Sequence, residues 1–269
     1  MARSFRLSVV AALLVFCSCC WSASWSWAGN EVSVPVLVYH RFGPTVADSM
    51  TVTTSVFESQ IKWLEANQYT VIPLRTLVSH LRGEGPAPPP KSVVITADDG
   101  HKTVFTEMQP IVRAYGIPVT LFIYPSAISN ASYAMTWEQL KELKQTGLFD
   151  IQSHTYWHPN FKKEKQKLSP EDYRKLVEAQ LQKSRIVLEN RLGSRVDLLA
   201  WPFGLYDDSL QKDAENAGYV AAFSIDRRHA ATSEAVMALP RYLMVNGDGT
   251  KGFEAIVTGR SAGKGPTGY

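Results

Sequence analysis

The chain has 269 residues, of which 45% are apolar and 20% are charged, and its formal net charge is only +3. This is the composition of a globular protein with a sizeable core. No run of Lys or Arg stands out, which argues against nucleic acid as a partner. Without an internal repeat or a linker, the chain is expected to form a single-domain monomer.

The first residues have the pattern of a secretory signal peptide. Arg3 and Arg6 form a basic start, residues 7–16 are an apolar stretch, and small residues precede a cleavage point at Ala28. We therefore expect a signal peptide at residues 1–28. An uncleaved anchor, with the tryptophans of this segment at a membrane interface, is the alternative.

Cleavage at that point predicts a secreted or periplasmic protein with no stable membrane span, a domain at residues 29–260 and a flexible tail at 261–269. Cys17, Cys19 and Cys20, the only cysteines, all lie in the leader. The mature chain then has no disulfide and no thiol nucleophile. Any metal ion must be bound by His, Asp or Glu.

Strand and helix patterns alternate along the rest of the chain. The first strand is expected at Val34–Tyr39, and a Ser55/Glu58 capping box predicts the start of a helix at Ser55–Tyr69. Further strands are expected at residues 71–72, 93–96, 119–124, 149–153, 196–200, 220–223 and 239–245, and further helices at 74–81, 104–115, 136–146, 169–192 and 207–217. This alternation predicts an α/β fold, a parallel sheet with crossover helices closed as a barrel or left open.

Two adjacent acids end the strand within Ser92–Gly100. The β-branched run before them is typical of a buried strand, and Gly100 closes it. Asp98 and Asp99 at the mouth of a buried strand are costly unless something binds them, because unpaired charge is expensive away from water. Active sites gather at this end of the strands in α/β folds. The pair therefore needs a partner elsewhere in the chain.

That partner is predicted at His154 and His158, which follow the strand at residues 149–153. Two histidines four apart point at one ion if their segment is a helical turn. With Asp99 as a third ligand they form a two-His, one-carboxylate site for a catalytic divalent ion. The alternative is that both histidines only cap a helix or bond to backbone carbonyls.

These motifs resemble those of the NodB-type polysaccharide deacetylases (carbohydrate esterase family 4). Thr96–Gly100 resembles the family's first motif, Thr-Phe-Asp-Asp-Gly, with Ala97 in place of the usual aromatic residue. Residues 154–159 resemble the second, His-Ser/Thr-x-x-His-Pro. The resemblance spans residues 35–245 and implies a distorted (β/α) barrel of the NodB homology type.

The resemblance also implies roles for the acids and histidines. Asp98 is the expected general base, and Asp99, His154 and His158 are the expected metal ligands. The physical logic agrees, since a divalent ion lowers the pKa of water and polarises an amide carbonyl. A carboxylate beside the ion, but not bound to it, can accept the proton. The alternative for Asp98 is a second metal ligand.

The third motif usually carries an Arg that orients the base, and Ala200–Gly204 lacks it. This stretch is similar to the Pro-Tyr/Phe-Gly form of the branch that deacetylates the biofilm exopolysaccharide poly-β-1,6-N-acetylglucosamine. The likeness implies that the Phe203 backbone N–H faces the oxyanion. Trp201 and Phe203, with Pro202 between them, are also candidates for an apolar substrate wall, and the alternative is that both aromatics belong to the core. Arg241 is the candidate to take the place of the missing Arg. The alternative is that Arg241 lies on the surface.

The general acid is expected to be His40. Most family members place it in a late Leu-x-His, but residues 239–245 contain no His. Residues 36–42 instead resemble the biofilm branch, in which the motif order is circularly shifted. First and last strands are neighbours in a barrel, so His40 can still reach the site. His229 is the alternative acid.

Together these features predict a metal-dependent N-deacetylase of an N-acetylglucosamine polysaccharide, which hydrolyses an amide bond. Zn²⁺ is the favoured ion, and Co, Ni or Fe also suits the ligands. A biofilm polysaccharide is the favoured substrate. The alternatives are a peptidoglycan or chitin deacetylase, an O-acetyl xylan-type esterase, and a catalytically dead glycan-binding module.

Overall fold

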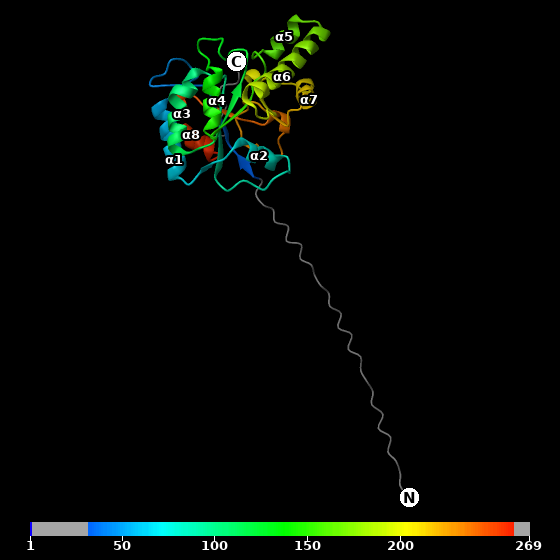
Figure 1. The fold of residues 1–269 in the computed structure, drawn as a ribbon. Helices are drawn as coiled ribbons and strands as arrows, with labels where there is room; N and C mark the ends of the chain where they lie inside the picture. Colours follow the sequence, from blue (N-terminus) through cyan, green and yellow to red (C-terminus); the bar gives the residue numbers. More distant parts are fainter. Residues whose placement is uncertain (2–31, 261–269) are drawn as a thin grey trace. The chain divides into compact units, whose positions relative to one another are not determined.

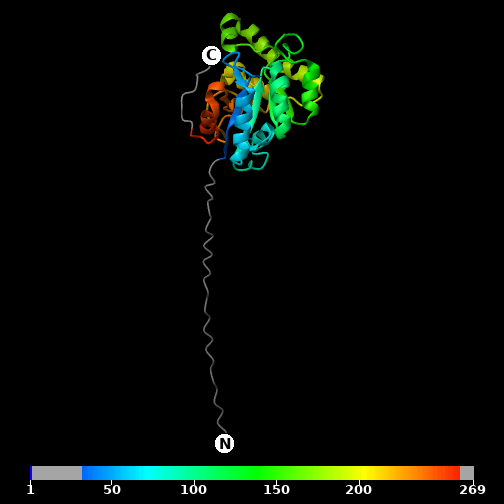
Figure 2. The ribbon, with the colours of Figure 1, turned by 90° about the vertical axis from the view of Figure 1, so that its left-hand side faces the viewer.

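The computed structural model describes Met1 and residues 32–260. A curled sheet of parallel strands forms its centre (Figure 1). In spatial order, its strands are β10 (Ala221–Phe223), β9 (Leu198–Ala200), β8 (Phe149–Ser153), β7 (Val119–Ile123), β6 (Ser92–Asp98), β2 (Val36–Tyr39) and β12 (Tyr242–Leu243), and β5 (Thr70–Val71) pairs with the start of β6. Figure 2 shows β2 beside β6, the pairing that brings His40 to Asp98.

The ends of this sheet approach each other through one short segment. Leu239 forms a parallel bridge with Phe223 of β10, and four residues later Leu243 pairs with Val38 of β2. The segment at 239–243 therefore links the two edges of the sheet. The predicted distorted (β/α) barrel is confirmed, and the closing segment carries Arg241 into its centre.

Helices connect most of the strands. They are α1 (Thr54–Ala66), α2 (Leu74–Leu81), α3 (Gln109–Tyr115), α4 (Trp137–Gln145), α5 (Phe161–Lys167), α6 (Pro170–Leu192), α7 (Asp208–Asn216) and α8 (Gly249–Val257). Single turns of π or 3-10 helix lie at Val104–Met108, Pro202–Gly204, Val236–Ala238 and Asn246–Asp248. In Figure 1, α1, α3, α4 and α8 lie to one side of the view and α6 and α7 to the other, and all six contribute buried residues to one core on the same face of the curled sheet. Helix α2 contributes to the core on the opposite face. Two small sheets, β1 (Ser33–Val34) with β11 (Ala230–Ala231) and β3 (Arg41–Gly43) with β4 (Thr51–Thr53), complete the fold.

The strands divide their side chains between two cores, since successive residues of a strand point to opposite faces. Val93 and Ile95 of β6 belong to the larger core, under the covering helices. Val94 belongs to the smaller core, with Phe122 and Phe223. Asp98 is four residues after Val94 and so shares its face, which places the acid inside the barrel.

Three local expectations are wrong in detail. The first strand is divided at Pro35, which has no N–H to donate, into β1 and β2. Helix α1 is capped by Thr53, whose hydroxyl accepts from the Val56 N–H, and not by a Ser55/Glu58 box. The helix expected at 104–115 begins as a π-helical turn before α3. By contrast, Ser169 caps α6 and Asp207 caps α7 as expected.

Candidate active site

Asp98 and Asp99 diverge because the chain turns sharply where β6 ends. Asp98 is the last residue of the strand and is 2% exposed. Asp99 and Gly100 follow with φ values of 72° and 75°, in the left-handed region. A Cβ at Gly100 would lie 3.0 Å from Ile123, so glycine is needed for both its φ and its packing. The two carboxylates therefore face different partners.

Asp98 is bound by Arg241, which is fully buried. Arg241 Nη1 donates to Asp98 Oδ1 at 2.9 Å and Nη2 donates to Oδ2 at 2.8 Å. Its Nε donates to the Ser224 carbonyl at 3.0 Å, and the guanidinium lies over the Phe122 ring. The surface alternative for Arg241 is wrong. The missing Arg of the third motif is replaced by one from the closing segment of the barrel.

This pairing sets the ionisation of Asp98. Burial alone would raise its pKa, but the charge of Arg241 and the hydrogen bonds that it donates outweigh burial and lower the pKa below its ordinary value. Asp98 is therefore a carboxylate at neutral pH. Its Oδ2 lies 3.8 Å from His154 Nε2, at the edge of a second cluster.

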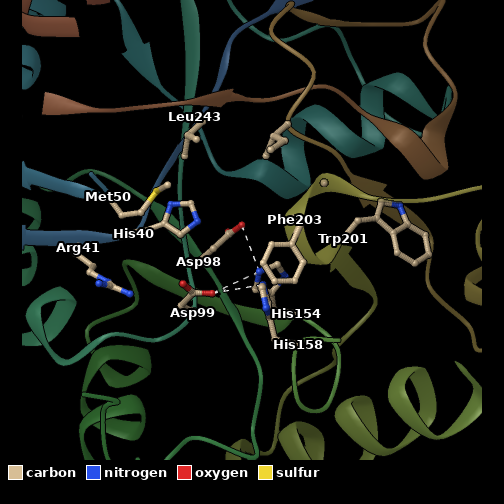
Figure 3. A pocket seen from close by; sticks show the side chains of 12 residues that line it. His40, Arg41, Met50, Asp98, Asp99, His154, His158, Trp201, Phe203 and Leu243 are labelled. Atoms are coloured by element: carbon tan, nitrogen blue, oxygen red, sulfur yellow. Dashed lines mark ion pairs between the residues drawn. The ribbon is translucent and has the colours of Figure 1, made fainter. Parts of the chain in front are cut away.

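That second cluster consists of Asp99, His154 and His158. Asp99 Oδ1 lies 3.7 Å from His154 Nε2 and 3.8 Å from His158 Nε2 (Figure 3). The three donor atoms all lie within 4.8 Å of one another. The structure therefore brings together the three residues that the sequence predicted to bind one ion.

The two histidines converge by a route that the spacing did not predict. Residues 154–158 are an irregular loop after β8 and not a helical turn. Thr155 and His158 have φ values of 64° and 61°, and both are left-handed. The loop is fixed by the buried Gln180, whose Oε1 accepts from the Tyr156 and Trp157 N–H groups at 3.1 and 2.9 Å. Gln180 gave no sequence signal, because it lies in the regular pattern of α6.

The histidines are held in the form that a metal ion needs. His154 Nδ1 lies 2.8 Å from the Ala200 carbonyl and donates a hydrogen bond to it, which leaves the Nε2 lone pair facing Asp99. Burial lowers the pKa of His154, and burial together with His154 lowers the pKa of His158 to about 4. Two neutral imidazoles and one carboxylate are a donor set that fits a divalent transition metal.

A cavity of about 220 Å³ opens beside this cluster (Figure 3). It is lined by His40, Arg41, Met50, Asp98, Asp99, His154, His158, Trp201, Phe203, Gly204, Ile225 and Leu243. Arg41, Met50, Ile225 and Leu243 were not among the site residues predicted from the sequence. Arg41 closely follows the first expected strand and Leu243 lies within the strand expected at 239–245, but nothing in their own residue types pointed to the site.

Of the two candidate acids, His40 lines this cavity and His229 does not. His40 follows β2, and its buried Nδ1 has no hydrogen-bond partner among the described residues. His229 donates from Nε2 to the Ile256 carbonyl at 2.8 Å. It precedes Ala230, which pairs with Val34 before the start of β2. His229 is therefore at the opposite end of the barrel from the acids.

The residues of the third motif differ in how far they reach the cavity. Trp201 is fully buried and its Nε1 donates to the Met237 carbonyl at 2.9 Å, so most of its ring belongs to the core. Pro202 is buried beneath the same turn. Phe203 has a φ of 57°, and its ring lies 4.5 Å from the His158 ring at the cavity wall. The turn therefore presents Phe203 to the cavity.

Comparison with known proteins identifies the family. The sequence model of the polysaccharide deacetylase family matches residues 85–222, just over half of the chain. The chain belongs to the polysaccharide deacetylase family. This confirms the resemblance of the two motifs and the expected class of enzyme, a polysaccharide deacetylase that hydrolyses a carbon–nitrogen bond.

Individual relatives are more distant. The YxkH protein of Bacillus subtilis is 26% identical over 236 residues, which cover 88% of this chain and 80% of that protein. A poly-β-1,6-N-acetyl-D-glucosamine N-deacetylase of Staphylococcus epidermidis is 26% identical over 211 residues, 77% of this chain and 71% of that protein. Among solved structures, the Streptococcus pyogenes deacetylase PplD in complex with acetate matches with a TM-score of 0.75 at 20% identity, over 85% of this chain and 99% of that one. It shares the fold.

Within the described residues, no helix is long and apolar enough to span a membrane.

Proposed function

We propose that this deacetylase is a divalent-metal-dependent enzyme that removes N-acetyl groups from poly-β-1,6-N-acetylglucosamine. The observation that carries the proposal is the division of the two acids. Asp98 is held by Arg241 at 2.9 and 2.8 Å, whereas Asp99 faces His154 and His158. The relative from Staphylococcus epidermidis, named for this polymer, supports the choice of substrate.

Asp99, His154 and His158 are the proposed metal ligands. Their donor atoms converge from the ends of β6 and β8, the two strands on either side of β7, and the Ala200 carbonyl fixes which nitrogen of His154 is available. Zn²⁺ suits this set best, and Co, Ni or Fe also binds two imidazoles and a carboxylate. When bound, the ion supplies Lewis-acid chemistry, lowering the pKa of water and polarising the acetyl carbonyl.

Asp98 is the proposed general base. It is ionised, because its pKa is lowered, and it lies at the edge of the metal cluster. Arg241 occupies both carboxylate oxygens from the barrel side and so fixes the plane of the group. A fixed carboxylate beside the reacting water accepts its proton without reorganisation.

His40 is the proposed general acid for the departing amine. It reaches the cavity from β2, which lies next to β6 in the sheet. Its buried Nδ1, without a protein partner among the described residues, costs free energy unless a bound group satisfies it. In Figure 3 the His40 ring faces the cavity across Asp98 from the two metal-binding histidines.

The turn at residues 202–204 is proposed to stabilise the oxyanion and to form part of the wall of the substrate site. The Phe203 backbone N–H is suited to stabilise the negative charge that forms on the acetyl oxygen. The Phe203 ring borders the cavity beside His158, with Trp201 and Pro202 packed behind it. This apolar surface suits the acetyl methyl group.

We further propose that the enzyme acts outside the cytoplasm as a monomer with its catalytic domain at residues 29–260. The signal peptide expected at 1–28 and the tail expected at 261–269 lie outside the described residues. The basic and apolar pattern of the leader supports export. A polymer substrate in the periplasm or the extracellular matrix agrees with this location.

Acetate release from a panel of acetylated polymers tests the proposal. The panel contains β-1,6- and β-1,4-linked N-acetylglucosamine, peptidoglycan and acetylated xylan, each with and without a chelator. We expect the highest rate on the β-1,6 polymer and its loss on chelation. Faster release from the β-1,4 polymer or peptidoglycan would reassign the substrate, and release from xylan alone would indicate an esterase. Glycan binding without release would indicate an inactive module.

A further inference from the structure

Large apolar side chains are exposed at few places in residues 32–260, and two of these places lie in loops beside the candidate site. The residues are Val46, Tyr133, Trp157 and Ile186, with 52%, 40%, 42% and 53% exposure. Tyr133 and Trp157 lie in the loops that follow β7 and β8, at the end of the sheet that carries the metal cluster. Exposed aromatic residues beside a cavity are typical of a ligand-binding surface.

Trp157 is held rigidly next to the cluster. It immediately precedes His158, and its N–H donates to the buried Gln180. The preceding residue is fixed as well, because the Ser126 N–H donates to the Tyr156 carbonyl and Lys183 lies 4.1 Å from the centre of the Tyr156 ring. An aromatic side chain on a fixed backbone loses little conformational entropy when a ligand binds to it.

Tyr133 reaches the same cluster through one intermediate ring. Its hydroxyl is hydrogen-bonded to that of Tyr124 at 2.6 Å, and the Tyr124 ring lies 5.3 Å from the His158 ring. On the other side, the Tyr133 ring is stacked against His101 at 6.1 Å. Tyr133 is therefore supported on two sides while 40% of it stays exposed.

The size of the cavity explains why such surfaces are needed. At about 220 Å³ it is smaller than the pockets of roughly 300–1,000 Å³ that enclose drug-sized ligands. It can admit one acetylated sugar but not a longer piece of a polymer. The neighbouring sugars must then lie on the surface around the opening. The apolar C–H face of a pyranose ring packs against an aromatic ring much as two rings stack.

We infer that Trp157 and Tyr133 are stacking platforms for the sugars next to the one that is deacetylated, and that they give the enzyme its preference for long chains. The inference rests on the proposed function, since it requires a polysaccharide substrate. The two side chains bind the polymer, whereas the metal cluster and Asp98 carry the reaction. Contacts of this kind lower KM for long substrates and leave the chemistry of a short one unchanged.

The test compares a long oligomer of β-1,6-N-acetylglucosamine with a chromogenic aryl acetate that occupies only the cavity. Trp157→Ala and Tyr133→Ala should each reduce kcat/KM for the oligomer about tenfold, through KM. Their kcat/KM for the aryl acetate should equal that of the wild type. Tyr133→Phe keeps the ring and should keep the activity on the oligomer. Ile186→Ala replaces an exposed apolar residue on α6; it is the matched control and should leave kcat/KM unchanged for both substrates.

Equal losses on both substrates, or no loss on the oligomer, would overturn the inference and leave the proposed function standing. A wild-type enzyme that cleaves the aryl acetate but not the oligomer would overturn the proposed function and this inference with it. Thermal unfolding of each variant separates lost contacts from lost folding, because substitutions at exposed positions usually change stability little.

Discussion

The pair of Asp98 and Arg241 is the most constrained feature at the scale of single residues. Both side chains are buried, and the four nitrogen–oxygen contacts of Arg241 include Thr96 and Ser224 as well as the carboxylate. Taking both charges from water is costly, so such a pair adds little net stability. Its use is positional, because it fixes the orientation and the ionisation of Asp98.

Replacing Arg241 with Met should leave Asp98 buried without its partner. We expect a loss of about 3–5 kcal/mol in the free energy of unfolding. With the guanidinium gone, the pKa of Asp98 rises, so the acid limb of kcat/KM moves to higher pH. The rate at the optimum should fall on the order of 100-fold as the carboxylate loses its orientation. Urea unfolding and a pH–rate profile measure these effects.

Arg241→Lys is the matched control, since it keeps the charge but not the two-pronged contact. In Arg241→Lys, the acid limb of kcat/KM should lie at a pH closer to that of the wild type than it does in Arg241→Met. An unchanged acid limb in Arg241→Met would contradict the role given to this residue.

His154 and His158, the histidines proposed to bind the metal ion, predict a pH dependence of stability in the metal-free protein. Burial and His154 lower the pKa of His158 from 6.5 to about 4 in the folded state. Between these values the unfolded chain binds a proton that the folded chain does not, so stability falls as pH falls from about 6.5 to about 4. Urea unfolding at pH 7 and pH 5 should show a smaller loss in His158→Gln. Equal losses in the two proteins would contradict the assignment.

At the scale of elements, the functional side chains depend on turns that most residues disfavour. Asp99, Thr155, His158 and Phe203 all have left-handed backbones, and all lie where a strand of the main sheet has just ended. A left-handed backbone is strained for residues other than glycine. This strain persists only where the surrounding structure fixes the conformation, and such positions are concentrated at functional sites. The sheet fixes where each loop begins, and the turn then aims its side chain.

Gly204 tests this dependence on turns. Its φ is 67°, and a Cβ there would lie 2.4 Å from Ile225 Cγ1 and 3.1 Å from the Ile225 nitrogen. Gly147 has a φ of 73° but open space around it. Gly147→Ala should cost only about 1 kcal/mol of backbone strain. Gly204→Ala should cost about 1–3 kcal/mol more and reduce activity, because the clash moves Phe203 and the cavity wall. Equal losses in the free energy of unfolding for Gly147→Ala and Gly204→Ala would contradict the close packing of Gly204 against Ile225.

The strand ends could be predicted from the sequence, but the loops could not. The run before Asp98 and the strand before His154 show local patterns, so the sequence predicted that the acids and the histidines follow strands. Their meeting was predicted from the types of ligand and from the two motifs. The route of residues 154–158 depends on Gln180, which lies 22 residues beyond His158 and looks like any helix residue. The burial of Arg241 depends on how the barrel closes, and no local pattern records that.

At the scale of the molecule, closure of the barrel assembles the site. Arg241 is 143 residues from Asp98 in the chain, and it arrives because residues 239–243 join β10 to β2. The same segment places Leu243 in the cavity wall. Asp98 lies between the metal cluster on one side and this segment on the other. The whole fold therefore gives two adjacent acids different partners, as the proposed roles of base and metal ligand require.

The most direct test of that separation measures bound metal and turnover together in Asp98→Asn and Asp99→Asn. Asp98→Asn should bind one Zn²⁺ per chain, as the wild type does, while kcat for acetate release falls about 10²- to 10⁴-fold. Asp99→Asn should lose the ion and, with it, the activity. If Asp98→Asn loses the ion, or keeps both the ion and the rate, Asp98 is not the base and the account is contradicted.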